Sequence, residues 1–172
     1  MAIAISLKDY LDEHGIEYNL VLQDPTKCSS RTAQASHVSG HDLAKGVVVK
    51  GKKSYLIAIV PASKRLRMRK MERWLKQPVC LATEDEIQNL FSDCENGAVP
   101  PIGAAYGLKS VMDEELRGHD DIYFEAGDHT TLIHVSGSQF DNLMQKIPRE
   151  NIGRSMEPDN ELEAQKYHFW GT

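Results

Sequence analysis

Two runs of mostly β-branched and aliphatic residues constrain the fold more strongly than any other feature of the sequence. The runs cover residues 47–49 and 55–60, and the polar turn Lys50-Gly51-Lys52-Lys53 joins them. Such runs, separated by a short turn that contains glycine, are typical of a β-hairpin. We therefore predict an antiparallel pair of strands, the second of which ends at Pro61 because proline lacks the backbone donor that a sheet requires.

The remaining periodic segments alternate irregularly between helices and strands. We expect helices over 6–14, 30–38, 63–75, 84–91 and 138–146, and strands over 17–22, 122–125 and 131–135. The helix starts are assigned to the capping residues Ser6, Ser63, Thr83 and Ser138. Because hairpins are interleaved with helices, we predict an α+β fold, a single domain with a mixed, mostly antiparallel sheet flanked by helices.

The length of 172 residues corresponds to about one domain. With 41% hydrophobic and 26% charged residues, the chain can bury a core of its own, so we expect a monomer. We assign the domain to residues 1–148, and residues 149–172 to a C-terminal tail or appendage. Three cysteines without paired spacing indicate a reducing compartment. With no signal-like start and no apolar run near about 20 residues, we expect no membrane partner and a cytoplasmic location.

Positive charge is concentrated in one segment of an acidic protein. Residues 45–76 carry eleven basic residues and one acid, a formal charge of +10, whereas the whole chain has a net charge of −5. This distribution is typical of a phosphate-binding face, although a solvated helix face is the alternative. The residues that we assign to this phosphate-binding face are Lys50, Lys52, Lys53, Lys64, Arg65, Arg67, Arg69, Lys70 and Arg73.

Motifs for metal or nucleotide cofactors are missing from the sequence. The seven histidines contain no H-E-x-x-H pattern, and a glycine interrupts the four-residue spacing of His37 and His41. His129 and His134 are five residues apart, which places them on opposite faces of a strand. The chain also lacks a G-x-G-x-x-G motif, a Walker loop and the G-x-S-x-G motif of serine hydrolases. We therefore expect no metal and no cofactor.

Two features are candidates for binding or chemistry. Lys45 begins the first hairpin strand between Ala44 and Gly46, at an apolar edge. The segment Gly97-Ala98-Val99-Pro100-Pro101-Ile102-Gly103 combines glycines, which allow close backbone approach, with prolines, which fix the shape of a loop. Each has an ordinary alternative, a surface lysine and a structural turn respectively.

These residues resemble the YbaK-like, or prolyl-tRNA synthetase-associated, editing domains, which deacylate mischarged aminoacyl-tRNA. The similarity lies in four segments in the same order, residues 43–49, 55–62, 93–103 and 122–131, and it extends over about 5–147. It implies a single mixed α/β domain whose pocket opens on the 3′ end of tRNA, and it makes the nine basic residues of the phosphate-binding face the expected tRNA-binding residues.

The resemblance also implies roles for individual residues. Lys45 matches a lysine that helps hold the terminal nucleotide, Gly97 and Pro101 match a GxxxP loop, and His129 matches a histidine of the later hairpin, so these four are the expected catalytic residues. Lys45 and the loop would form one site. Thr32 matches a position that lines the aminoacyl pocket. The expected substrate-binding residues are Thr32, Gly46, Ala98, Val99, Pro100 and Gly103.

The function that follows is a trans-editing hydrolase that acts on aminoacyl-tRNA, with a synthetase as a further expected partner. Gly46 stands where alanine-specific members commonly carry a polar residue, so alanyl, seryl, threonyl and cysteinyl esters all remain open as substrates. One alternative is a non-catalytic module that binds tRNA ends or amino acids. Another is an interaction scaffold that uses the aromatic cluster of the tail.

Overall fold

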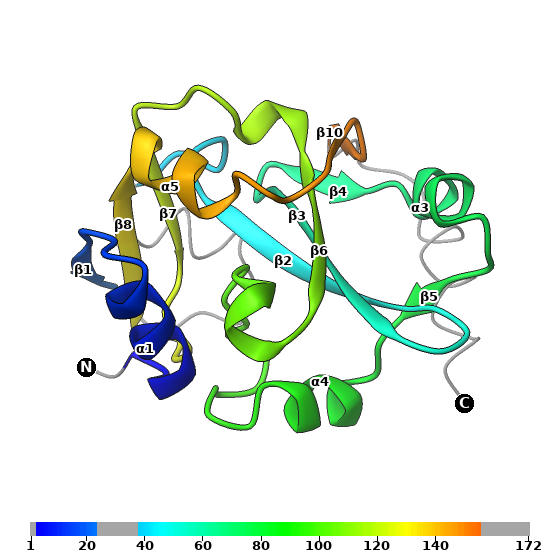
Figure 1. The fold of residues 1–172 in the computed structure, drawn as a ribbon, viewed down its shortest axis with the longest axis horizontal. Coiled ribbons are helices and arrows are strands. Elements are labelled where there is room, and N and C mark those ends of the chain that lie inside the picture. The colour runs from blue at the N-terminus through cyan, green and yellow to red at the C-terminus, as the bar shows by residue number, and fades with distance from the viewer. Residues whose placement is uncertain (1–2, 24–37, 156–172) are drawn as a thin grey trace.

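The computed structural model describes residues 3–23 and 38–155 (Figure 1). Its central element is a five-stranded sheet in the order β5-β2-β3-β6-β9. The strands are β2 (Ala44–Lys50), β3 (Tyr55–Pro61), β5 (Cys80–Leu81), β6 (Lys109–Asp113) and β9 (Arg149–Glu150). β5, β2 and β3 pair antiparallel, whereas β3, β6 and β9 pair parallel. The sheet is therefore mixed.

Two smaller sheets accompany the central one. The first is antiparallel in the order β1-β8-β7, formed by β1 (Asn19–Leu22), β7 (Asp121–Glu125) and β8 (Thr131–Ser136). A single bridge between Leu43 and Tyr123 links it to the start of β2. The second is an antiparallel pair of β4 (Lys64–Leu66) and β10 (Gly153–Ser155). Most strand pairs are antiparallel, so the predicted fold class is confirmed.

The helices cover the two faces of β2 and β3. They are α1 (Ile5–Glu13), α3 (Met68–Leu75), α4 (Glu84–Leu90) and α5 (Gly137–Leu143), with 3₁₀ turns η1 (Gly103–Tyr106) and η2 (Glu114–Leu116). α1 and α5 lie on one side of β2 and β3 and α3 on the other (Figure 1). In the described residues, no helix combines the length and the apolar character that crossing a membrane requires.

The alternation of side chains along β2 divides the core in two. Ala44 and Val48 belong to the larger cluster, which includes residues of α1, β7, β8 and α5. Val49 belongs to the smaller cluster with Met68 and Met71 of α3, and Val47 packs at its border. Successive residues of a strand point to opposite faces. The same alternation decides what each polar residue of β2 faces.

Several predicted elements are confirmed. The hairpin forms in register, with Val47 opposite Ala58, and the later pair of strands forms as β7 and β8. The capping box of Thr83 is present, because its hydroxyl accepts from the Glu86 amide while the Glu86 carboxylate accepts from the Thr83 amide.

Three helix starts were predicted wrongly. The first helix begins at Ile5 without a side-chain cap, and the Ser6 amide instead donates to Asp93 (2.9 Å). Ser63 precedes the strand β4, and α3 begins only at Met68, because Lys64–Leu66 finds a ladder partner in β10. The last helix is capped by Ser136, whose hydroxyl accepts from the Gln139 amide.

The expected domain boundary at residue 148 does not end the fold. β9 and β10 lie beyond it and pair with β6 and β4, so residues 149–155 pack as part of the same structure. The strand expected over 17–22 begins at Asn19. The helix expected over 30–38 lies outside the described residues except for Val38.

Candidate functional site

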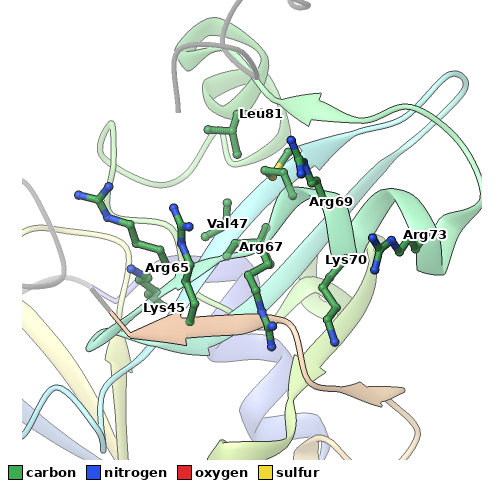
Figure 2. A pocket seen from close by; sticks show the side chains of 11 residues that line it. Lys45, Val47, Arg65, Arg67, Arg69, Lys70, Arg73 and Leu81 are labelled. Carbon is green, nitrogen blue, oxygen red and sulfur yellow. The ribbon is translucent and has the colours of Figure 1, made fainter. Parts of the chain in front are cut away.

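A pocket of about 550 Å³ opens between β2, β4, β5, β10 and α3 (Figure 2). Seven of its lining residues are cationic: Lys45, Arg65, Arg67, Arg69, Lys70, Arg73 and Arg154. The other four are apolar: Val47, Leu66, Met68 and Leu81. Among the described residues that line it, none is acidic. Clefts lined by charges of one sign concentrate the electric field, so this pocket attracts anions.

Strand and helix geometry bring these side chains together. Lys45 and Val47 are two apart on β2 and therefore share the face that α3 covers. Met68 and Met71 are the buried residues of α3, so the helix sits on the sheet through its apolar side and keeps its arginines at the solvent. Arg65 lies directly opposite Arg154 in the β4–β10 ladder.

The basic residues that we assigned to tRNA binding divide into two groups. Arg65, Arg67, Arg69, Lys70 and Arg73 line the pocket, whereas Lys50, Lys52, Lys53 and Lys64 do not. Lys52 and Lys53 are exposed on the hairpin turn. Thus the positive segment of the sequence forms more than one surface.

The two remaining lysines of that group are held by carboxylates. Lys50 Nζ lies 2.9 Å from Glu86 Oε2, and Lys64, with its side chain 13% exposed, pairs with Glu115. The Tyr55 hydroxyl donates to the same Glu86 carboxylate. Hydrogen bonds from Tyr55 and then Lys50 lower the pKa of Glu86 to about 2. These ion pairs anchor the hairpin and β4.

Gly97 and His129, two of the expected catalytic residues, are brought together. Gly97 has φ +84°, a conformation that side-chain-bearing residues rarely adopt, and a Cβ built there would lie 3.6 Å from Cε1 of His129. His129 Nε2 donates to the carbonyl oxygen of Asn96 (2.6 Å). Because a carbonyl only accepts, this bond places a proton on Nε2 and fixes the ring beside the loop.

The rest of the glycine–proline loop is packed into the protein. Ala98, Pro100, Pro101 and Gly103 are buried, and Val99 is half-buried. A Cβ at Gly103 would lie 2.4 Å from the Ser110 hydroxyl, so this glycine is required by packing. In the described structure, the backbone of these glycines therefore lies close to side chains of the protein itself.

The side chain of Lys45 and the glycine–proline loop lie on opposite faces of β2. A Cβ at Gly46 would lie 2.6 Å from Cδ1 of Ile57 and 3.3 Å from Cα of Pro101, so Gly46 faces the loop. Lys45, its neighbour, faces α3 and the pocket. No residue of 97–103 lines that pocket. Lys45 and the loop, which we expect to form one site, thus flank one strand in the described structure.

A cysteine near the loop is unsuited to nucleophilic chemistry. Cys94 is buried, with its sulfur 3.3 Å from the Tyr106 hydroxyl and 3.6 Å from Asp93 Oδ1. Burial raises the pKa of the Cys94 thiol to about 12. Burial alone would also raise the pKa of Asp93, but hydrogen bonds, led by that of the Ser6 amide, hold it below its usual value. The thiol is thus protonated at neutral pH, and thiols attack as thiolates.

One expected site residue is not described by the structure, and some residues that line the pocket were not expected. Thr32 lies outside the described residues. Arg154 and the apolar lining of the pocket were not expected; the only signal for Arg154 was a basic residue in an acidic tail. Within residues 3–23 and 38–155, no three histidine, cysteine or carboxylate side chains gather as metal ligands would.

Several solved structures share the fold of this chain. The chain is similar to a solved candidate trans-editing enzyme for prolyl tRNA synthetase, with 23% identity and a TM-score of 0.76 over 88% of this chain and 97% of that one. The hypothetical protein APE2540 is 20% identical, with a TM-score of 0.75 over 87% of this chain and 99% of that one. A candidate signal transduction protein from Marinobacter aquaeolei VT8 is 13% identical, with a TM-score of 0.72 over 88% of this chain and 31% of that one.

At these identities the structural likeness shows a shared fold. The comparison with curated proteins found no match. A family model, described as the aminoacyl-tRNA editing domain, matches residues 23–143. The match spans most of the chain and includes β2, the glycine–proline loop and the β7–β8 hairpin, and the protein therefore belongs to the aminoacyl-tRNA editing domain family.

Proposed function

We propose that this protein is an aminoacyl-tRNA deacylase that acts in trans, hydrolysing the ester of tRNA mischarged with a small amino acid. The observation that carries the proposal is the pocket of seven cations and four apolar residues in a chain that belongs to the editing family. Phosphates would meet the cations, and the apolar lining would contact a base or ribose.

The need for such an activity follows from the limits of binding specificity. A synthetase pocket gains only about 1–3 kcal/mol from one methylene and cannot strongly reject a smaller or near-isosteric amino acid. A second site that hydrolyses the wrong product corrects these errors. Alanyl, seryl, threonyl and cysteinyl esters are all of suitable size, and the reaction would occur in the cytoplasm, where tRNA is charged.

An aminoacyl ester is already activated, so the enzyme has little covalent chemistry to perform. It must hold the carbonyl, position a water and stabilise the charge that develops. In the proposal, Lys45 acts through its fixed charge beside a phosphate of the terminal nucleotide. The backbone at Gly97, held by His129, would orient the ester or the water, and the ribose hydroxyl of the substrate would carry the proton.

The edge of β2 would allow one substrate to contact both faces. β5 pairs with β2 at Val49 and Lys50, the Ala82 amide donates to the Val48 carbonyl (3.0 Å), and the next described partner on that side is the bridge from Leu43 to Tyr123. No described strand pairs with β2 between these points. A tRNA end bound there would have its phosphate near Lys45 and its ester toward the loop.

A non-catalytic binding module is the second candidate. It is favoured by the separation of Lys45 from the loop, since the described pocket lining contains cations and apolar groups but no acid or histidine to act as a base. Such a module would bind tRNA ends and leave the ester intact.

Incubation of the purified protein with a panel of labelled alanyl-, seryl-, threonyl- and cysteinyl-tRNA, each matched and mischarged, separates the two candidates. The proposal expects catalytic loss of at least one mischarged species, with and without added prolyl-tRNA synthetase. Stable binding with no ester loss across the panel would select the binding module.

A further inference from the structure

The short strand β10 places two arginines opposite each other at the rim of the pocket. In its antiparallel ladder with β4, Arg154 is the direct partner of Arg65, and both side chains line the pocket. Directly opposed residues in such a ladder have Cβ atoms about 4.5–5.5 Å apart, and like charges at these positions are destabilising. Two guanidinium groups placed this close together present forked N–H donors that match the geometry of a phosphate.

A buried carboxylate holds the turn from which β10 starts. Asp113, at the end of β6, is fully buried. Its Oδ2 accepts from the amides of Ile152 (3.0 Å) and Gly153 (2.6 Å), and its Oδ1 accepts from the amide of Glu115 (3.0 Å). Charge-assisted bonds of this kind are the strongest hydrogen bonds available to a backbone amide. Asp113 thus fixes β10 relative to the central sheet.

A side chain at the clamped position would displace the turn. A Cβ at Gly153 would lie 3.0 Å from Asp113 Oδ2 and 2.9 Å from Cδ of Lys64. On the other side of the turn, the Arg67 amide donates to the Ile152 carbonyl (2.7 Å) and the Arg67 guanidinium donates to the Asn151 side chain (2.8 Å). The turn is therefore held from both sides.

The clamp matters because the register of a strand decides which face each side chain occupies. A slip of one residue in β10 would move Arg154 from the pocket to the opposite face of the ladder. A two-stranded ladder of three residues has little stability of its own. The position of Arg154 consequently depends on the contacts of residues 151–153.

We propose that Arg154 and Arg65 form a paired phosphate-binding site for the acceptor end of tRNA, and that Asp113 is a positioning residue that holds Arg154 in it. The nature of the polyanion rests on the proposed function; the paired site and its clamp rest on the geometry of β4, β10 and β6. The C-terminal strand is then part of the binding surface.

The test measures binding of uncharged tRNA as a function of KCl concentration for the wild-type chain, Arg154→Gln and Arg117→Gln. Arg117 is an exposed arginine outside the pocket and serves as the matched control. Loss of one contact to a single-stranded phosphate reduces the slope of log K against log salt by about 0.7. We expect this reduction in Arg154→Gln alone. The inference would be overturned if Arg154→Gln had the same slope as the wild-type chain. It would also be overturned if the slope of the wild-type chain itself were near zero.

The positioning role is tested by a double-mutant cycle with Asp113→Asn. If Asp113 acts through Arg154, the double variant binds tRNA no more weakly than Arg154→Gln, whereas a purely structural role gives additive losses. Should Asp113→Asn fail to fold, Gly153→Ala, which displaces the same turn, takes its place in the cycle. Additive losses in the cycle would overturn the role of Asp113.

Because uncharged tRNA is the probe, the outcome is separate from that of the deacylation panel. Binding with the expected change of slope, but without ester hydrolysis, would reject the proposed deacylase and retain the phosphate site. Hydrolysis with an unchanged slope in Arg154→Gln would retain the deacylase and reject the phosphate site.

Discussion

Gly46 lies against Pro101 so closely that a Cβ atom on the glycine would be 3.3 Å from the Cα atom of the proline. This contact joins the first hairpin to the glycine–proline loop. Lys45, which directly precedes Gly46 on β2, faces the basic pocket instead. A single step along β2 thus separates the face that holds the loop from the face that attracts anions.

Enlarging Gly46 is expected to disturb the loop. In Gly46→Ala, the new methyl would meet Cδ1 of Ile57, which can move, and the backbone of Pro101, which moves less readily. We expect a loss of about 1–3 kcal/mol in the free energy of unfolding, measured with urea, as is usual for overpacking. Gly40→Ala is the control, because a Cβ at Gly40 would make an ordinary 3.4 Å contact with Ser63. Equal stability of the two variants would contradict this view of the contact.

Removing the Lys45 charge is expected to abolish most of the proposed activity while the fold remains. We expect Lys45→Ala to lower deacylation of the mischarged substrate by at least about 100-fold, the cost typical of losing one preorganised electrostatic contact. Lys146→Ala, which changes an exposed lysine outside the pocket that has no assigned role, should retain activity. Near-normal turnover of Lys45→Ala, with a native circular dichroism spectrum, would contradict the assigned role.

His129 is expected to act on the loop beside it. His129→Ala removes the hydrogen bond to the Asn96 carbonyl, so it should cost about 0.5–1.5 kcal/mol of stability and loosen Gly97. We expect a lower kcat for deacylation with little change in tRNA affinity. His134→Ala, which removes a surface pair with Asp121, serves as the comparison. Identical kinetics of the two variants would leave His129 without a role in the reaction.

Acid is expected to weaken the anchoring of the hairpin. The hydrogen bond from Tyr55, and then that from Lys50, lowers the pKa of Glu86 from 4.5 to about 2. These contacts therefore stabilise the fold fully above pH 4.5, and their contribution disappears as the pH falls toward 2. In Glu86→Gln that part of the acid dependence should be missing. Urea unfolding of both proteins at several pH values between 5 and 2 is the measurement. Parallel stability curves would show that the ionised Glu86 carboxylate, with its contacts to Tyr55 and Lys50, contributes nothing.

Local patterns were sufficient for elements whose partners are close in the sequence. The hairpin of β2 and β3 follows from two β-branched runs and a polar turn, and the start of α4 from the Thr83 capping box. In both, the stabilising contacts are made within a few residues, so the sequence alone specifies them.

Tertiary contacts decided the rest. Ser63 and Lys64 begin a pattern that would suit a helix, yet Lys64–Leu66 became a strand because β10, far along the chain, supplied its ladder. The same pairing brought Arg154 into the pocket, which no local pattern could indicate.

The sequence named six of the seven cations that line the pocket, but neither Arg154 nor the arrangement of the site. Short sequence motifs contain Lys45, Gly97, Pro101 and His129, and the composition of residues 45–76 reveals the positive segment. Which face of β2 each group meets depends on the pleat of that strand and on what packs against its two sides. Those packing choices are set by the whole core at once, and so only the folded structure places Lys45 among arginines and the loop behind it.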